Sequence, residues 1–274
     1  MSEEVGQAVP TCGYHTNVIE MGSGAPLVLL HGSGPGVSAW ANWRGVAPVF
    51  AEHFRVLMPD LVGFGYTDEP ADYEFTFMDS WVSQIEALLA ATVDEPVTLV
   101  GNSFGGAVAL AFTIAHPKRV KRLVLMGSVG TQGTLSDGLD QVWGYTPSLE
   151  NMRGVLDVMA WNRDLVTDDL AQMRYQASLR EGVQERFARL FPEPRQRWLD
   201  AIARPDESIA AIQQPTLLLH GRDDRVIPLA FSERLHQLIP NSQLHSFGQC
   251  GHWTQIEQAQ RFIALVTHFA QEAL

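Results

Sequence analysis

The chain has 274 residues, of which 46% are hydrophobic, and its formal net charge at pH 7 is −12. This charge balance argues against a nucleic-acid partner, because binding to phosphates needs clustered Lys and Arg. It also means that an anionic substrate would need positive side chains close to its binding site.

Composition also bears on compartment and on metals. The sequence contains no run of about 18 apolar residues, so we expect no membrane span. Residues 1–7 lack the charged and apolar segments of a signal peptide, and we therefore expect a cytoplasmic protein. The two cysteines, Cys12 and Cys250, do not make a disulfide framework, and no Cys/His group has zinc-ligand spacing. We expect no metal and interpret Cys250 as a small packing residue.

Apolar runs and helical patterns alternate along most of the chain. The runs predict strands at 27–31, 56–59, 97–100, 122–126, 216–220 and 243–247, and the helical patterns lie at 77–91, 105–116 and 229–238. Such alternation predicts an α/β domain with a mostly parallel sheet and helices on both faces. The nearly continuous hydrophobicity of each strand indicates burial on both sides.

The first of these strands opens into a glycine-rich loop, Gly32-Ser33-Gly34-Pro35-Gly36. Its backbone N–H groups are suitable donors for an oxyanion, and Ser33 is the candidate donor. An ordinary turn and a phosphate-binding loop are the alternatives. Nucleotide binding is disfavoured, because no Lys-Ser/Thr pair and no G-x-G-x-x-G register with an acidic partner follow the strand.

The strand at 97–100 leads into Gly101-Asn102-Ser103-Phe104-Gly105, a G-x-S-x-G stretch followed by a predicted helix. A tight turn from strand to helix exposes a serine Oγ, and small neighbours allow the turn without clashes. Ser103 is therefore the candidate nucleophile. The backbone N–H of Phe104, directly after it, is the second candidate oxyanion donor.

A helical and aromatic stretch interrupts the alternation after the strand at 122–126. We interpret it as a cap over the carboxyl ends of the strands, enclosing an apolar pocket with limited access of water. The predicted organisation is a first core segment at 1–130, a cap at 131–208 and a second core segment at 209–274. The pocket is assigned to the cap as a segment, because any single aromatic residue is more often internal packing.

The candidate acid and base follow the last two predicted strands, in the chain order Ser, Asp, His. Asp224 lies in the turn after 216–220, and the spacing from Gly221 favours it over its neighbour Asp223. His252 lies in a glycine-containing loop after 243–247. In this arrangement His252 would take the Ser103 proton, and Asp224 would hold and stabilise the imidazolium.

Three stretches of the sequence together resemble the meta-cleavage product hydrolases of the α/β-hydrolase fold. They are Gly32-Ser33-Gly34-Pro35-Gly36 with Trp40-Ala41-Asn42-Trp43, Gly101-Asn102-Ser103-Phe104-Gly105-Gly106, and Cys250-Gly251-His252-Trp253-Thr254-Gln255. The resemblance covers nearly the whole chain and looks closest to the branch that acts on products of single-ring catechols. It implies serine-dependent hydrolysis of a carbon–carbon bond in a 2-hydroxy-6-oxohexa-2,4-dienoate, without a cofactor.

The resemblance also implies a set of substrate-binding residues. Arg174 in the cap, with Asn42, Asn102 and the indole N–H of Trp253, would hold the carboxylate and dienol oxygens. The alternative interpretations are that Arg174 is an exposed helix residue and that Asn102 is a turn former. A homodimer or a higher homo-oligomer is expected from the same resemblance.

Two other classes of function use the same motifs. A carboxylesterase or a perhydrolase would have the same serine, acid, base and oxyanion donors, so only the carboxylate-binding set separates them from the dienoate hydrolase. A receptor-like protein of this fold would bind a small ligand in the capped pocket with little turnover. A haloalkane dehalogenase is disfavoured, because its elbow carries Asp where this chain has Ser103.

Overall fold

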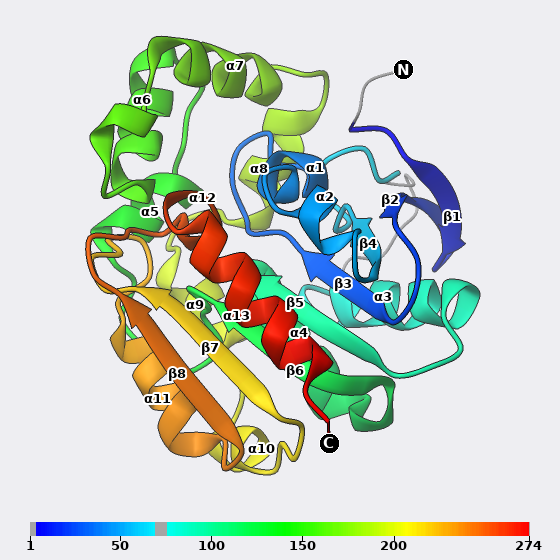
Figure 1. The fold of residues 1–274 in the computed structure, drawn as a ribbon. Coiled ribbons are helices and arrows are strands. Elements are labelled where there is room, and N and C mark those ends of the chain that lie inside the picture. Colours follow the sequence, from blue (N-terminus) through cyan, green and yellow to red (C-terminus); the bar gives the residue numbers. More distant parts are fainter. Residues whose placement is uncertain (1–3, 69–75, 274) are drawn as a thin grey trace.

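An eight-stranded sheet runs through the part of the chain that the computed structural model describes, residues 4–68 and 76–273 (Figure 1). Its strands are β1 (Gln7–Thr11), β2 (Tyr14–Met21), β3 (Pro26–Leu30), β4 (Arg55–Pro59), β5 (Val97–Asn102), β6 (Val120–Met126), β7 (Thr216–Gly221) and β8 (Ser242–Phe247). The order across the sheet is β1-β2-β4-β3-β5-β6-β7-β8. All neighbouring pairs from β4 to β8 are parallel, whereas β2 pairs antiparallel with both β1 and β4.

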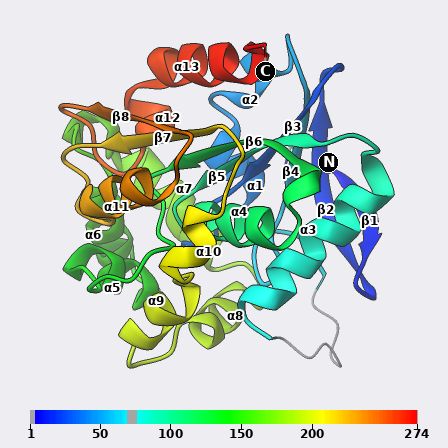
Figure 2. The same cartoon turned by 90° about the horizontal axis from the view of Figure 1, so that it is seen from below.

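Helices cover both faces of this sheet, as the alternation in the sequence predicts. The core helices are α1 (Ala39–Trp43), α2 (Ala47–Phe50), α3 (Met78–Thr92), α4 (Phe104–Ala115), η1 (Pro117–Arg119), α10 (Asp206–Ala210), α11 (Ala230–Leu238), α12 (Thr254–Glu257) and α13 (Ala259–Gln271). Figure 2 shows α2 and α13 on one side of the sheet and α3, α4 and α11 on the other.

The sheet divides the hydrophobic core into two layers. Along β3, Val28 and Leu30 join the cluster under α3 and α4, whereas Leu27 and Leu29 join the cluster under α13. This division follows from the two-residue period of a strand, which sends successive side chains to opposite faces. All four side chains are fully buried, which explains why the strand is a continuous apolar run.

The predicted strands and helices agree with the observed ones to within one or two residues at each end. The N-terminal hairpin β1–β2 was not among the predicted elements. Its burial pattern shows the reason, because β1 is mostly exposed and β2 contains the polar residues His15, Asn17 and Glu20. A strand at the edge of the sheet needs no continuous apolar run, so its pattern is weak.

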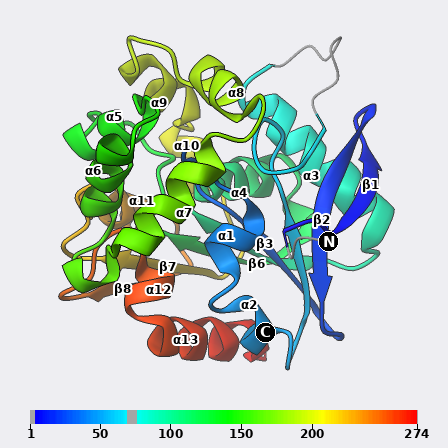
Figure 3. The ribbon, with the colours of Figure 1, turned by 90° about the horizontal axis from the view of Figure 1, so that it is seen from above.

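A helical cap lies between β6 and β7, over the carboxyl ends of the parallel strands (Figure 3). It contains α5 (Asp137–Trp143), α6 (Leu149–Met159), η2 (Arg163–Leu165), α7 (Asp168–Ser178), α8 (Val183–Leu190) and α9 (Gln196–Ile202). The side chains of Ser136, Ser148 and Thr167 accept backbone N–H groups in the first turns of α5, α6 and α7. The domain boundaries proposed from the sequence stay a prediction, and the one at 208 falls inside α10, which contacts α4 and α11 of the core.

In the described residues, no helix has the length and apolar character that a membrane crossing requires. Residues 1–3 of the stretch inspected for a signal peptide lie outside the described residues.

Candidate active site

Ser103 occupies the sharp turn between β5 and α4, as the G-x-S-x-G pattern predicts. Its backbone has φ 55° and ψ −117°, a left-handed conformation that a residue with a side chain rarely adopts. The Ser103 N–H donates to the Met126 carbonyl at 2.8 Å, which ties the turn to the end of β6. Strained backbone held in this way is common at functional positions.

Two glycines allow the turn to pack closely. A Cβ at Gly101 would stand 2.4 Å from the Gly105 carbonyl oxygen, and one at Gly105 would stand 2.3 Å from the His31 carbonyl oxygen. Real Cβ atoms do not come so close, so larger residues would push α4 away from β5 and from the loop after β3. The glycines therefore bring the serine turn and the glycine-rich loop together.

Asp224 and His252 meet at the carboxyl ends of β7 and β8. The carboxylate Oδ2 of Asp224 accepts a hydrogen bond from Nδ1 of His252 at 2.7 Å, and both side chains are buried. Oδ1 accepts the N–H groups of Val226 and Ile227 at 2.8 and 2.9 Å. The acid is therefore held at both oxygens, and the imidazole at one nitrogen.

The surroundings of Asp224 favour its charged form. Burial by itself would raise the pKa of this carboxyl, but the charge of His252 and hydrogen bonds from His220 and His252 hold it well below its usual range. His220 lies beside Asp224, with Nε2 3.4 Å from Oδ2.

Asp223, the alternative acid, faces another way. Its Oδ2 accepts the Gln249 N–H at 2.8 Å and lies 3.8 Å from Nη2 of Arg222. The residue that contacts the candidate base is therefore Asp224, as the spacing favours. Cys250, beside this base, is fully buried, and burial raises the pKa of its thiol to about 12. Such a thiol is a packing group and not a nucleophile.

The two candidate oxyanion donors are both present without acceptors. In the described part of the chain, the backbone N–H groups of Ser33 and Phe104 make no hydrogen bond. Phe104 is the first residue of α4, whose N–H has no partner within the helix. Unpaired backbone donors beside a strained serine are the arrangement that an oxyanion hole requires.

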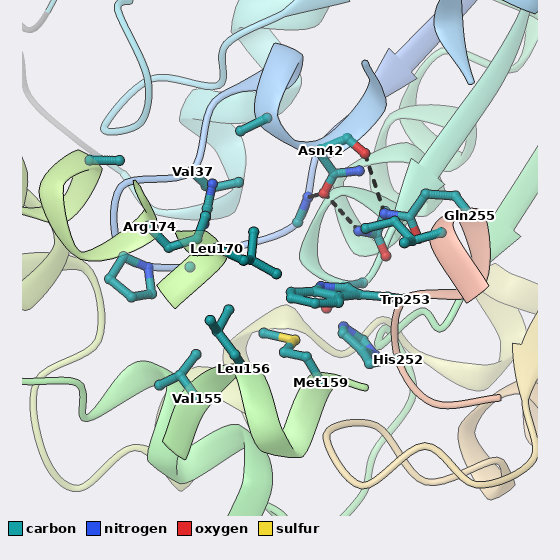
Figure 4. A pocket seen from close by; sticks show the side chains of 18 of the residues that line it. Val37, Asn42, Val155, Leu156, Met159, Leu170, Arg174, His252, Trp253 and Gln255 are labelled. Carbon is teal, nitrogen blue, oxygen red and sulfur yellow. Dashed lines mark hydrogen bonds between the residues drawn. The ribbon is translucent and has the colours of Figure 1, made fainter. Parts of the chain in front are cut away.

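A cavity of about 320 Å³ lies between the cap and the core, and both Ser103 and His252 line it. Figure 4 shows Val155, Leu156 and Met159 of α6 opposite His252 and Trp253. The pocket thus lies under the cap, as predicted, and its cap wall is aliphatic rather than aromatic. Within residues 4–68 and 76–273 no hydrogen bond joins Ser103 Oγ to His252; catalytic contacts of this kind often tighten only when substrate is bound.

Three carboxamides form one polar part of the pocket wall. Asn42 Oδ1 accepts a hydrogen bond from Asn102 Nδ2 at 2.8 Å, and the main-chain oxygen of Asn42 accepts one from Gln255 Nε2 at 3.3 Å (Figure 4). Asn42 Nδ2, Asn102 Oδ1 and Gln255 Oε1 are buried without a hydrogen-bond partner among the residues that the structure describes. Each buried polar group without a partner lowers the stability of the fold by about 1–3 kcal/mol. A polar ligand that hydrogen-bonds to such a group would offset this loss.

Arg174 projects from α7 toward the same cavity, at the opposite side from His252 (Figure 4). Its guanidinium makes no hydrogen bond or ion pair with any described residue. Burial lowers its pKa to about 10, with the nearby charges of Arg44 and Arg180 acting in the same direction and Glu4 opposing them. At neutral pH the group is still charged, so the pocket contains an unpaired cation.

Trp253 completes the predicted set, directly after His252 and in the pocket lining. The structure adds pocket residues that the sequence reasoning did not select: Glu4, Arg44 and Gln255. Gln255 stands in the quoted Cys250–Gln255 stretch and could have been found there. Arg44 and Glu4 carry no local signal, because only the packing of α1 and the N-terminal segment against the cap brings them to the pocket.

Hydrogen bonds join the cap to the loop that carries His252. The His252 N–H donates to the Met159 carbonyl at 2.8 Å. The carboxylate of Glu257 accepts the N–H groups of Gly251, Trp161 and Asn162 at 2.8 to 2.9 Å. Because two of these donors belong to the cap and the third is Gly251, Glu257 connects the cap to the loop that carries the candidate base.

Comparison with known proteins identifies the family. A model of the α/β hydrolase fold matches residues 25–259. The chain is 56% identical to a 2-hydroxy-6-oxo-2,4-heptadienoate hydrolase of Pseudomonas putida, with 98% of this chain and 97% of that protein covered. It is 52% identical to a 2-hydroxymuconate semialdehyde hydrolase of Pseudomonas sp. strain CF600, over 99% and 96% of the two chains.

The chain belongs to the meta-cleavage product hydrolases. A crystal structure of the meta-cleavage product hydrolase CumD superimposes with a TM-score of 0.97 at 52% identity, covering 98% of this chain and 99% of that one. A second, the S103A mutant of CumD from Pseudomonas fluorescens IP01 complexed with acetates, gives a TM-score of 0.95 at 52% identity and 97% coverage of both chains. The family and fold predicted from the sequence are confirmed.

The described residues contain no group of three or more His, Cys, Asp or Glu that could hold a metal ion. The chemistry that this meta-cleavage product hydrolase can offer from these residues is that of a serine, an imidazole and a carboxylate. Unpaired backbone donors and an unpaired guanidinium stand in or beside the same pocket.

Proposed function

We propose that this chain hydrolyses a carbon–carbon bond in a 2-hydroxy-6-oxohexa-2,4-dienoate, such as 2-hydroxymuconic semialdehyde or a 6-alkyl analogue. The observation that carries the proposal is the unpaired Arg174 guanidinium in a pocket that Ser103 and His252 also line. The names of the relatives at 52–56% identity support the substrate class. The acetates in the complexed CumD mutant support a carboxylate ligand in this family.

The positions of the charged and catalytic side chains favour one orientation of the bound substrate. Its carboxylate pairs with Arg174, which can donate two parallel hydrogen bonds despite the negative net charge of the chain. The remote carbonyl then points toward the side of the pocket where His252 lies (Figure 4), and Ser103 lines the same pocket. Asn42, Asn102 and the indole N–H of Trp253 hold the carboxylate and dienol oxygens between these ends.

The reaction proceeds in two stages. The dienol first ketonises, so that the carbon leaving group can depart as a stabilised dienolate. His252 then takes the Ser103 proton, Ser103 Oγ attacks the C6 carbonyl, and the N–H groups of Ser33 and Phe104 stabilise the oxyanion. Asp224 holds the imidazolium that forms.

Collapse of this intermediate breaks the C5–C6 bond. The dienolate takes a proton and leaves as 2-hydroxypenta-2,4-dienoate, while the acyl group stays on Ser103. Water, activated by His252, hydrolyses the acyl-enzyme and releases a small carboxylic acid, which is formic or acetic acid for single-ring substrates. No step needs a metal or an organic cofactor.

The unpaired Arg174 guanidinium has no role in the reactions or binding expected of the alternative classes of protein. A carboxylesterase or perhydrolase would need the triad and the oxyanion donors but no guanidinium opposite them. A receptor-like protein would need neither a strained serine nor a fixed Asp–His pair. Arg174 therefore favours the anionic dienoate over a neutral ester.

The test compares substrates and variants. Purified protein should remove the yellow ring-fission products of catechol and 3-methylcatechol, and Ser103→Ala should lower the rate by several orders of magnitude. Arg174→Met should reduce kcat/KM for the dienoates roughly 10- to 100-fold, as expected for loss of charged hydrogen bonds. The matched control is Arg153→Met, which removes a cap arginine that pairs with Asp168 on the surface.

Two results would reject the proposal. In the first, neither yellow product decays while p-nitrophenyl acetate is hydrolysed, which indicates an esterase. In the second, Arg174→Met lowers the rates on dienoate and ester equally, which indicates a structural role for Arg174. A cytoplasmic location and a homodimer or higher homo-oligomer stay predictions.

A further inference from the structure

Arg44 lies at the mouth of the pocket, where the core meets the cap. It directly follows α1, its side chain is exposed, and it lines the same cavity as Arg174. Its Nη1 and Nη2 atoms lie 4.0 and 3.9 Å from Sδ of Met173 on α7. The Arg44 guanidinium therefore stands against the helix turn that carries Arg174.

The charges around this mouth are unbalanced. In the described chain, neither Arg44 nor Arg174 forms an ion pair with a carboxylate. The carboxylate in the described lining is that of Glu4, which accepts hydrogen bonds from Tyr66 at 2.7 Å and Ser38 at 3.3 Å. A local excess of positive charge thus stands at the entrance of a protein whose net charge is −12.

The position of Arg44 suits a role in substrate entry rather than in the chemistry. It is exposed and comes from the core, whereas Arg174 is half-buried and comes from α7 of the cap. An exposed charge at the entrance of a cleft raises the association rate of a ligand of opposite charge, and salt screens this effect. A global charge of −12 repels anions, and a local cation at the rim opposes this repulsion where the substrate enters.

We propose that Arg44 captures the carboxylate of an incoming anionic dienoate at the pocket mouth and guides it toward Arg174. The inference rests on the proposed function for the identity of the substrate. It assigns to Arg44 a role in binding and specificity for carboxylates, and none in bond cleavage.

Kinetics at varied ionic strength test the proposal. Arg44→Met removes the charge and keeps an unbranched apolar side chain against Met173. We expect kcat/KM for the dienoate, relative to that for a neutral ester, to fall about three- to tenfold at low salt and to converge on the wild-type ratio near 0.5 M salt. Arg44→Lys should retain most of the activity, because the point charge remains.

Lys118→Met is the control for a simple change in net charge. Lys118 is exposed in η1, at the amino end of β6 and thus at the opposite end of the sheet from the pocket. Its removal should change the same ratio by less than about 1.5-fold. Equal effects of Arg44→Met and Lys118→Met, or a loss that does not depend on salt, would overturn the proposal.

Binding of sorbate, hexa-2,4-dienoate, provides a test that does not depend on turnover. Isothermal titration calorimetry should show about three- to tenfold weaker binding to Arg44→Met than to the wild type at low salt. Unchanged affinity, or no binding of sorbate to the wild type, would refute the role of Arg44. If sorbate binding behaves as expected but no dienoate is cleaved, the proposed function fails while the carboxylate site at the mouth stands.

Discussion

Asp224→Asn is the substitution whose effect the structure specifies most fully. The Asn carbonyl oxygen can still accept the Val226 and Ile227 N–H groups, which now hold Asp224 Oδ1 at 2.8 and 2.9 Å. Its NH₂ group then faces Nδ1 of His252, where the carboxylate oxygen stood at 2.7 Å. Two donors cannot share this contact, so Nδ1 must become the acceptor and the proton must move to Nε2.

An imidazole with its proton on Nε2 cannot take the Ser103 proton. The neutral amide also cannot stabilise the imidazolium. In the serine-protease triad the same substitution lowers kcat by about 10⁴-fold, and we expect a loss of this order. A 10⁴-fold loss corresponds to about 5.4 kcal/mol in the activation free energy. The fold should be retained, because the bonds to Val226 and Ile227 remain.

Asp223→Asn is the matched control, since it makes the same chemical change one residue away. Asp223 contacts the Gln249 N–H and Arg222 but not His252. The kcat of the Asp223→Asn variant should therefore differ from that of the wild type by less than about threefold. Single-turnover decay of the yellow dienoate measures both variants, and circular dichroism checks their folding. The assignment of the acid is wrong if Asp224→Asn keeps more than a tenth of the wild-type rate. It is also wrong if Asp223→Asn loses more of the wild-type rate than Asp224→Asn does.

Three further predictions concern the surroundings of the site. Burial lowers the pKa of His31 in the folded protein from 6.5 to about 4. Between these pH values the imidazole is protonated in the unfolded chain but not in the folded one, so the wild-type free energy of unfolding falls as the pH falls. His31→Gln should therefore lower the free energy of unfolding, measured with urea, by about 2 kcal/mol less at pH 5 than at pH 7. An equal loss at both pH values would contradict this. Gly127→Ala should slow dienoate turnover about 10- to 100-fold, because Gly127 has φ +51° and a Cβ there would stand 3.3 Å from the His252 ring; an unchanged kcat would disprove the contact. Glu257→Gln should speed hydrogen exchange at the Gly251 amide and lower kcat, because the single oxygen of Gln still accepts the Trp161 and Asn162 N–H groups while its NH₂ group faces the Gly251 N–H; exchange at the wild-type rate would show that Glu257 does not hold the loop of His252.

The candidate triad could be proposed from the sequence because each of its residues is marked by local sequence and by chain order. Ser103 follows an apolar strand in a small-residue turn, and Asp224 and His252 follow the last two strands, whose carboxyl ends meet at one edge of a parallel sheet. The candidate oxyanion donors Ser33 and Phe104 follow from the same pattern of strand and turn. The cap was predictable as a segment, because its helical pattern interrupts the alternation.

Other parts of the site depend on long-range packing that leaves no local pattern. Arg44 is an ordinary arginine after a short helix, and only its contact with Met173 of the cap places it at the pocket. Glu4 reaches the pocket from the N-terminal segment, and Glu257 joins two loops that are far apart in the sequence. Arg174 looks like an exposed helix residue, and only the family resemblance singled it out.

Product analysis with the ring-fission product of 3-methylcatechol tests serine-dependent cleavage of the carbon–carbon bond most directly. Purified protein is incubated with this yellow dienoate, and acetate and 2-hydroxypenta-2,4-dienoate are quantified as the absorbance decays. We expect both products to form in equal amounts, at the rate of the absorbance decay, and Ser103→Ala to form neither. Persistence of the yellow colour, or its decay without acetate, would contradict serine-dependent cleavage of the carbon–carbon bond.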